Sequence, residues 1–111
     1  MNSPYFLMEK ELPWTDLGGG VKRQILGYNQ DIMMVKVAFE KGSIGAAHKH
    51  PHTQSSLCVS GKFEVDIEGQ RSVVSAGDGF YVAPDLVHGV RCLEAGMLLD
   101  AFAPCRKDFL P

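Results

Sequence analysis

Three of the four histidines in this chain lie within seven residues, in the stretch His-Lys-His-Pro-His-Thr-Gln that runs from His48 to Gln54. His48 and His50 are two residues apart, so both side chains point to the same face of an extended strand. The fourth histidine, His88, lies 34 residues beyond Gln54. Imidazole binds zinc, copper, iron and nickel, and a catalytic metal site keeps positions open for substrate. The spacing indicates either one metal site with an added oxygen ligand, or a histidine-rich surface loop and an unrelated His88.

The elements that must position these side chains are expected to be β-strands. Apolar residues alternate with other residues over 31–40 and, more cleanly, over 62–68, which is typical of antiparallel strands with one buried face. Turn-forming residues recur at short intervals, including Ser60-Gly61 and the stretch 94–96. No window of a dozen residues carries a helical stripe of apolar side chains. The pattern predicts one all-β domain over residues 1–111, a sandwich or a barrel.

Composition excludes several classes of protein. The chain of 111 residues has 45% hydrophobic and 22% charged residues and a formal charge of -2, without a basic stripe for nucleic acid. No stretch approaches the roughly 18 apolar residues of a membrane span. The first residues lack the pattern of a secretory signal. The three cysteines are odd in number and widely spaced, so we expect free thiols in a reducing cytosol. These features favour a cytoplasmic protein without nucleic-acid or membrane partners.

Two motifs resemble those of the cupin superfamily. Residues 42–61 read G-x5-H-x-H-x3-Q-x6-G, with Gln54 where the family more often has glutamate. Residues 77–90 resemble the second motif more loosely, with Ala83 and Asp85 at the usual proline and glycine positions. The resemblance implies a double-stranded β-helix, or jelly-roll barrel, that holds one metal ion in its mouth.

A broader resemblance points to one branch of that superfamily. The segments 13–29, 33–45, 48–54 and 98–110 are similar to the KdgF-type pectin-degradation cupins. Such proteins linearise 4,5-unsaturated uronates, the monosaccharides left by pectate and alginate lyases, to 4-deoxy-5-keto uronates. The resemblance implies catalytic roles for Asp100 and Arg106 and substrate-binding roles for Phe102 and Arg106. It implies the metal ligands His48, His50, Gln54 and His88.

The chemistry of this reaction independently requires such residue types. Opening the cyclic hemiacetal needs a base for the hydroxyl proton, and a divalent cation would stabilise the enolate. Asp100 shares a strand face with Leu98 and Phe102, where an unpaired carboxylate is costly to bury. The alternative is a strand-end aspartate that faces solvent. Arg106 is either a bidentate clamp for the substrate carboxylate or a plain surface residue.

Three further interpretations stay open at this level. Phe102 is either a stacking platform for a sugar or simple core, and His52 is either a hydrogen-bond donor next to the ligands or a solvated loop residue. Gln54 would leave the metal its full dipositive charge, which favours Lewis-acid chemistry on an anionic sugar over redox chemistry. The competing functions are another cupin metalloenzyme, such as an iron or copper dioxygenase, and a non-catalytic metal- or sugar-binding module. The metal itself is left open among nickel, zinc, iron, cobalt and manganese.

The oligomeric state is predicted from the risk that an exposed strand edge carries. An unpaired edge strand invites pairing with another chain, and dimerisation covers it. We therefore expect a homodimer in which the segment 33–39 takes part.

Overall fold

The computed structural model describes residues 1–111 and contains eight antiparallel strands with two 3-10 helices of three residues each. The elements are η1 (Glu9–Glu11), β1 (Thr15–Gly18), β2 (Val21–Tyr28), β3 (Met33–Phe39), β4 (Ile44–His48), β5 (Thr53–Ile67), β6 (Gln70–Ser75), β7 (Gly79–Val82), β8 (His88–Ala103) and η2 (Lys107–Phe109). The all-β prediction is confirmed. Neither helix is long and apolar enough to cross a membrane.

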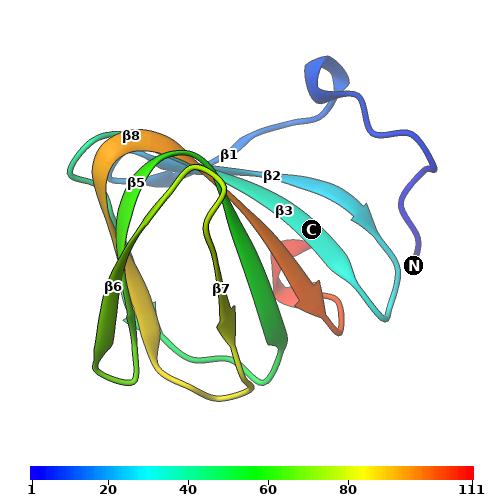
Figure 1. Cartoon of the computed structure of the whole chain (residues 1–111). Helices are drawn as coiled ribbons and strands as arrows, with labels where there is room; N and C mark the ends of the chain where they lie inside the picture. The colour runs from blue at the N-terminus through cyan, green and yellow to red at the C-terminus, as the bar shows by residue number, and fades with distance from the viewer.

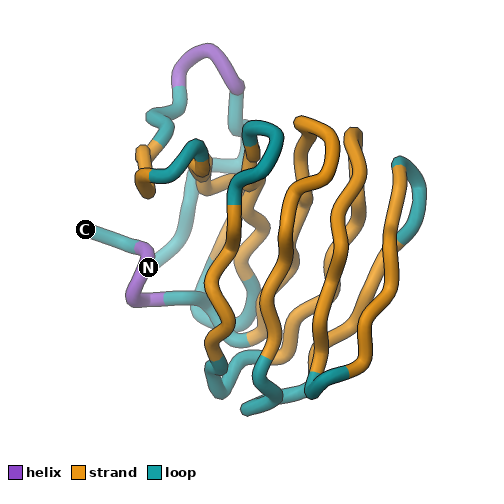
Figure 2. Tube along the Cα trace, turned by 90° about the vertical axis from the view of Figure 1, so that its left-hand side faces the viewer, coloured by secondary structure: helices purple, strands orange, loops and turns teal.

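The long strands β5 and β8 organise the fold, because each contributes to both layers of the jelly roll. Residues 54–57 of β5 pair with β7, and residues 96–102 of β8 pair with β3, which leads on to β2 and β1. Residues 62–67 of β5 pair with β6, and residues 88–91 of β8 pair with β4. Both strands arch over between their two halves (Figure 1). In the view turned by 90°, the strands lie side by side around one interior (Figure 2).

The arch corrects two sequence predictions. Ser60-Gly61 and residues 94–96 were expected to be turns, but they lie inside the continuous strands β5 and β8. The pairing register shifts between Cys58 and Phe63, and Gly61 has a φ of 81°. Glycine adopts this left-handed conformation without a steric penalty, so it supports a bulge that bends the strand without ending it. The glycines therefore mark bends within two long strands. The alternation of apolar and polar residues in a sequence does not distinguish such a bend from a turn.

The edge-strand argument for residues 33–39 is wrong. These residues form β3, which lies between β2 and β8 and is hydrogen-bonded along both edges. The strands with a single neighbour are β1, β4, β6 and β7. Sequence alternation identifies a strand but not its place in the sheet. The homodimer stays a prediction, and β3 cannot supply it by edge pairing.

The core lies between the two layers and confirms the predicted alternation. Met33 and Val35 of β3 are fully buried, as is Phe63 of β5. One cluster fills the space under the arch, and a smaller cluster packs where β3, the end of β8 and the C-terminal turn meet. The larger cluster contains Val21, Phe39, Cys58, Phe63, Val65, Val74, Cys92 and Leu98, and the smaller contains Met33, Val35, Phe102 and Cys105. All three cysteines are buried free thiols.

Strands β5 and β8 pass so close to each other at their bends that one extra methyl group there should lower the stability of the fold. A Cβ on Gly96 would collide with the Ser60 carbonyl oxygen and lie 2.6 Å from the Gly61 Cα. Gly96→Ala should therefore lower the free energy of unfolding by more than about 2 kcal/mol, measured by urea denaturation. Gly69→Ala is the control, because its φ of 83° costs about 1 kcal/mol but its Cβ would meet no atom within 4 Å. Equal losses in the two variants would contradict the close crossing of β5 and β8.

Candidate metal centre

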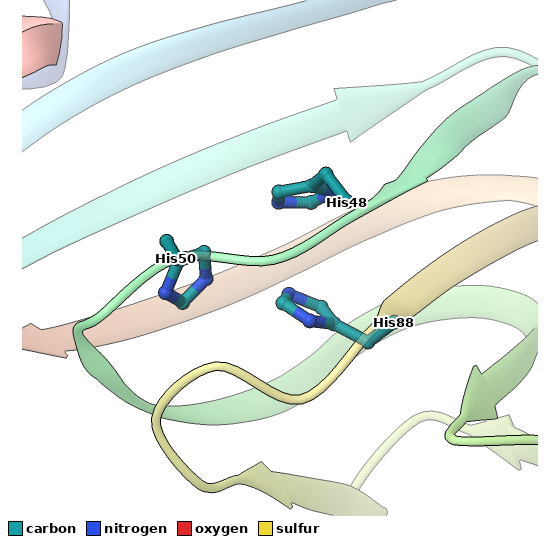
Figure 3. Close-up of side chains that lie close together, drawn as sticks. All are labelled: His48, His50 and His88. Atoms are coloured by element: carbon teal, nitrogen blue, oxygen red, sulfur yellow. The ribbon is translucent and has the colours of Figure 1, made fainter.

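Strand pairing brings the two histidine stretches together. His48 ends β4 and His88 begins β8, and the two residues are directly paired across these strands. His50 lies in the loop just after β4. Figure 3 shows the three imidazoles turned toward one shared space. One ring nitrogen from each lies within 4.8 Å of the others, so the surface-loop interpretation is wrong and the three residues form a possible metal site.

Backbone carbonyl groups fix the orientation of all three rings. Each Nδ1 lies at hydrogen-bond distance from a carbonyl oxygen two residues away. The pairs are His48 with Ala46 at 2.9 Å, His50 with His52 at 3.1 Å, and His88 with Leu86 at 2.9 Å. A carbonyl oxygen only accepts, so these bonds place the proton on Nδ1 and leave Nε2 with a free lone pair. The Nε2 of His88 is buried and has no partner within the protein.

Burial keeps two of these rings in the neutral form that a metal requires. It lowers the pKa of His50 below its usual value, outweighing the opposite effect of the Gln54 hydrogen bond. Burial likewise lowers the pKa of His88, outweighing the hydrogen bond from its ring to Leu86. Lone pairs are therefore available at neutral pH on both buried rings.

Gln54 lies where it could act as a fourth donor beside the three histidines. Its Oε1 lies 2.9 Å from the Nε2 of His50, and its Nε2 donates to the Ser56 hydroxyl at 3.0 Å. The second bond fixes the amide so that its oxygen faces the histidines. In neutral His50 with its proton on Nδ1, two lone pairs then face each other, which is unfavourable unless a cation lies between them. Three imidazole nitrogens and one amide oxygen fit a divalent transition metal.

His52 stands apart from this donor set. Its backbone carbonyl accepts the His50 Nδ1 proton, and its ring lies 6.5 Å from the Phe102 ring, measured between centroids. The Nδ1 of the His52 ring is buried without a partner, so the predicted donor role of this side chain is not seen, and only the backbone carbonyl orients a neighbouring ring.

Asp100 is buried beside the donor set. It lies opposite Ser56 in the β5–β8 pairing, and the Ser56 hydroxyl donates to its Oδ1 at 2.5 Å. Its exposed fraction is only 9%, so the solvent-facing interpretation is wrong. Burial raises the pKa of Asp100 to about 6, although the Ser56 bond and the Arg106 charge both act to lower it. A carboxyl group that titrates near neutral pH is suited to proton transfer.

A cavity of about 320 Å³ opens onto these groups. His48, Gln54, His88 and Asp100 all line it, together with Arg106. Its volume lies at the lower end of the range for small-molecule sites.

Arg106 is buried at the cavity, and its role as a clamp for the substrate carboxylate stays a prediction. It is 7% exposed, so it is not a plain surface residue. However, its Nε and Nη2 already bond to the two carboxylate oxygens of Asp108, at 3.0 and 2.8 Å. This edge of the guanidinium is therefore occupied by Asp108, whereas the edge formed by Nη1 and the second N–H of Nη2 stays open to a carboxylate.

Phe102 belongs to the core and also borders the cavity. It is 4% exposed, it packs in the smaller core cluster, and its ring meets His50 edge-on at 5.6 Å between centroids. The core interpretation is confirmed, and stacking on a sugar stays a prediction.

Sequence reasoning missed three residues of this site. Ser56 lies two residues from Gln54 on the inward face of β5, so strand parity could have found it. Arg23 lines the cavity from β2 and lies on the same face of that strand as Val21. Like Asp100, Arg23 is a charged residue on an otherwise apolar strand face. No pattern in the sequence marks the pairing of Asp108 with Arg106, because it depends on the path of the chain after β8.

The donor set predicts which histidines hold metal. His88→Ala should lose bound divalent metal, measured by elemental analysis after dialysis, because it removes a buried free lone pair. His52→Ala should keep the metal, since only its backbone supports the site. Circular dichroism spectra like that of the parent would show that both variants fold. Full metal occupancy in His88→Ala would contradict the site.

The buried carboxyl group predicts a pH-dependent stability. Because the folded pKa of Asp100 lies above the ordinary value of 3.8, ionisation above pH 6 destabilises the metal-free fold. Asp100→Asn should therefore unfold with a free energy up to about 3 kcal/mol higher at pH 8, at about 1.4 kcal/mol for each pKa unit. The gain should shrink as the pH falls through 6 and vanish near pH 4. A gain that does not depend on pH, in urea titrations of metal-free protein, would contradict the burial argument.

Comparison with known proteins agrees with the cupin fold. The cupin domain family model matches residues 35–102. The chain is 44% identical over 107 residues to the pectin degradation protein KdgF of Dickeya dadantii (strain 3937), covering 95% of this chain and 97% of that protein.

Two solved structures are also closely similar. An RmlC-like cupin from Shewanella frigidimarina NCIMB 400 has a TM-score of 0.96 and 43% identity, covering 98% of each chain. The structure of KdgF from Halomonas sp. has a TM-score of 0.92 and 35% identity, covering 97% of this chain and 100% of the other. This chain therefore belongs to the cupin family and is a homologue of the pectin degradation protein KdgF.

Proposed function

We propose that this protein is a metal-dependent enzyme that converts 4,5-unsaturated uronate monosaccharides into linear 4-deoxy-5-keto uronates. The observation that carries the proposal is the buried Asp100, whose carboxyl group borders the same cavity as the metal donors His48, Gln54 and His88. The substrate class is supported by the similarity to KdgF proteins, which are named for pectin degradation. A sugar acid is also the kind of anion that a cavity bordered by guanidinium groups accepts.

The reaction is an isomerisation that moves one proton. The substrate is a cyclic hemiacetal whose ring oxygen is bonded to the alkene carbon C5. Loss of the C1 hydroxyl proton lets the C1 carbonyl form while the bond between C1 and the ring oxygen breaks. The electron pair stays on the former ring oxygen as an enolate at C5. A proton added at C4 then gives the C5 ketone, so the product has the same atoms as the substrate.

Asp100 is suited to both proton transfers. Its pKa of about 6 leaves much of the carboxyl group ionised at neutral pH, ready to accept the hydroxyl proton. The same value lets the protonated acid give a proton back at C4. Because Ser56 donates to Oδ1, Oδ2 is the oxygen left to take the proton.

The four donors suit an ion that acts by charge. A divalent cation held by the three histidines and Gln54 supplies Lewis-acid stabilisation of the negative charge that develops on the ring oxygen. All four donors are neutral, so they cancel none of the charge of the ion. This property favours an anionic sugar over redox chemistry, and the donor set accepts nickel, zinc, iron, cobalt or manganese.

The direct test uses the monosaccharides that a pectate lyase releases. Purified protein is added with each of the five divalent metals in turn, and the alkene absorbance is followed. We expect a metal-dependent loss of absorbance without consumption of oxygen. Unchanged absorbance with every metal, or turnover that consumes oxygen, would contradict the proposed reaction.

Replacing the proposed base should slow the reaction and leave the metal in place. Asp100→Asn keeps the size of the side chain but cannot accept the hydroxyl proton, so kcat should fall by about 10² to 10⁴. Asp66→Asn is the matched control, since Asp66 pairs with Arg71 and does not line the cavity. A parental rate in Asp100→Asn would exclude the role, and loss of metal would reassign Asp100 to the ligands.

A further inference from the structure

Arg23 brings a second guanidinium group to the cavity. It reaches the cavity from β2, whereas Arg106 reaches it from the segment after β8. Both guanidinium groups lie against the ring of Phe109, with the guanidinium carbon 3.8 Å from the ring centre for Arg23 and 4.1 Å for Arg106. Contact with an aromatic ring holds a guanidinium group in place without using its hydrogen-bond donors. The donors of Arg23 therefore stay available to a ligand.

The charges of the two arginines are compensated differently. Arg106 has both carboxylate oxygens of Asp108 as partners. Arg23 forms no ion pair, and its Nε is buried without a hydrogen-bond partner in the protein. Burial, and next the charge of Arg106, lower the pKa of Arg23, so its positive charge is disfavoured where it lies. A buried donor on a cation costs free energy until an acceptor reaches it.

We propose that Arg23 binds the carboxylate of the sugar and selects uronates over neutral sugars. The planar fork of arginine matches a carboxylate, and Arg23 is the arginine in this cavity that has no carboxylate partner in the protein. The identity of the reacting sugar rests on the proposed function. Binding of a uronate by Arg23 requires the cavity but does not require that the proposed reaction takes place.

The experiment separates these two claims by using a uronate that cannot react. Galacturonate and galactose are titrated by NMR into metal-loaded parent, Arg23→Met and Arg91→Met. Arg91→Met is the control, because it removes the same charge from an exposed residue that does not line the cavity. KM and kcat for the unsaturated uronate, and the thermal midpoint, are measured on the same variants.

We expect the parent and Arg91→Met to bind galacturonate more tightly than galactose. Arg23→Met should lose roughly ten- to a hundredfold in galacturonate affinity and bind galactose as the parent does. Its KM should rise by a similar factor, with kcat within a few fold of the parent. Its thermal midpoint should be no lower, because the substitution removes a buried donor that has no partner.

Three results would overturn the proposal. The first is equal binding of galacturonate and galactose by the parent, and the second is parental galacturonate affinity in Arg23→Met. The third is an affinity that falls only together with the thermal midpoint, which would make Arg23 structural. If Arg23→Met does not fold, Arg23→Gln is judged by the same criteria. Inactivity on the unsaturated sugar, with binding of galacturonate that depends on Arg23, would contradict the proposed function and leave this inference standing.

Discussion

The site depends on one chain of hydrogen bonds across the pairing of β5 with β8. Gln54 donates to Ser56, and Ser56 donates to Asp100, so the orientation of the proposed ligand Gln54 and the position of a buried carboxylate are set together. The register of the two strands places Ser56 directly opposite Asp100. Because β5 and β8 bend through both layers, the same pair of strands also carries His88 to its place opposite His48. The strands that form the core thus also assemble the site.

The arrangement favours binding over stability of the empty protein. Lone pairs of His50 and Gln54 face each other, the Asp100 carboxylate is buried with a raised pKa, and the Nε of Arg23 is buried without a partner. Each of these features raises the free energy of the empty protein. A cation bound at the histidines, or an anion bound at the arginine, would offset that cost. Such unrelieved polar groups are typical of sites made for ligands.

The sequence predicted those parts of the protein that depend on local spacing. The alternation of residues 62–68 predicted a strand, and the spacing of His48 and His50 predicted two members of the histidine cluster that could hold a metal ion. The sequence could not show which strands are neighbours, so β3 was wrongly expected at an edge. It could not separate the bend at Gly61 from a turn, since a glycine in a left-handed conformation serves both. Pairing of Arg106 was equally hidden, because its partner depends on a turn without periodicity.

The measurement that tests the metal centre most directly is anomalous X-ray diffraction from crystals of the protein grown with nickel. We expect one strong anomalous peak, within bonding distance of the Nε2 atoms of His48, His50 and His88 and the Oε1 of Gln54. Asp100 should be bonded to Ser56 and should not touch the ion. A peak bound through Nδ1, a peak without Gln54, or a peak ligated by Asp100 would contradict the account.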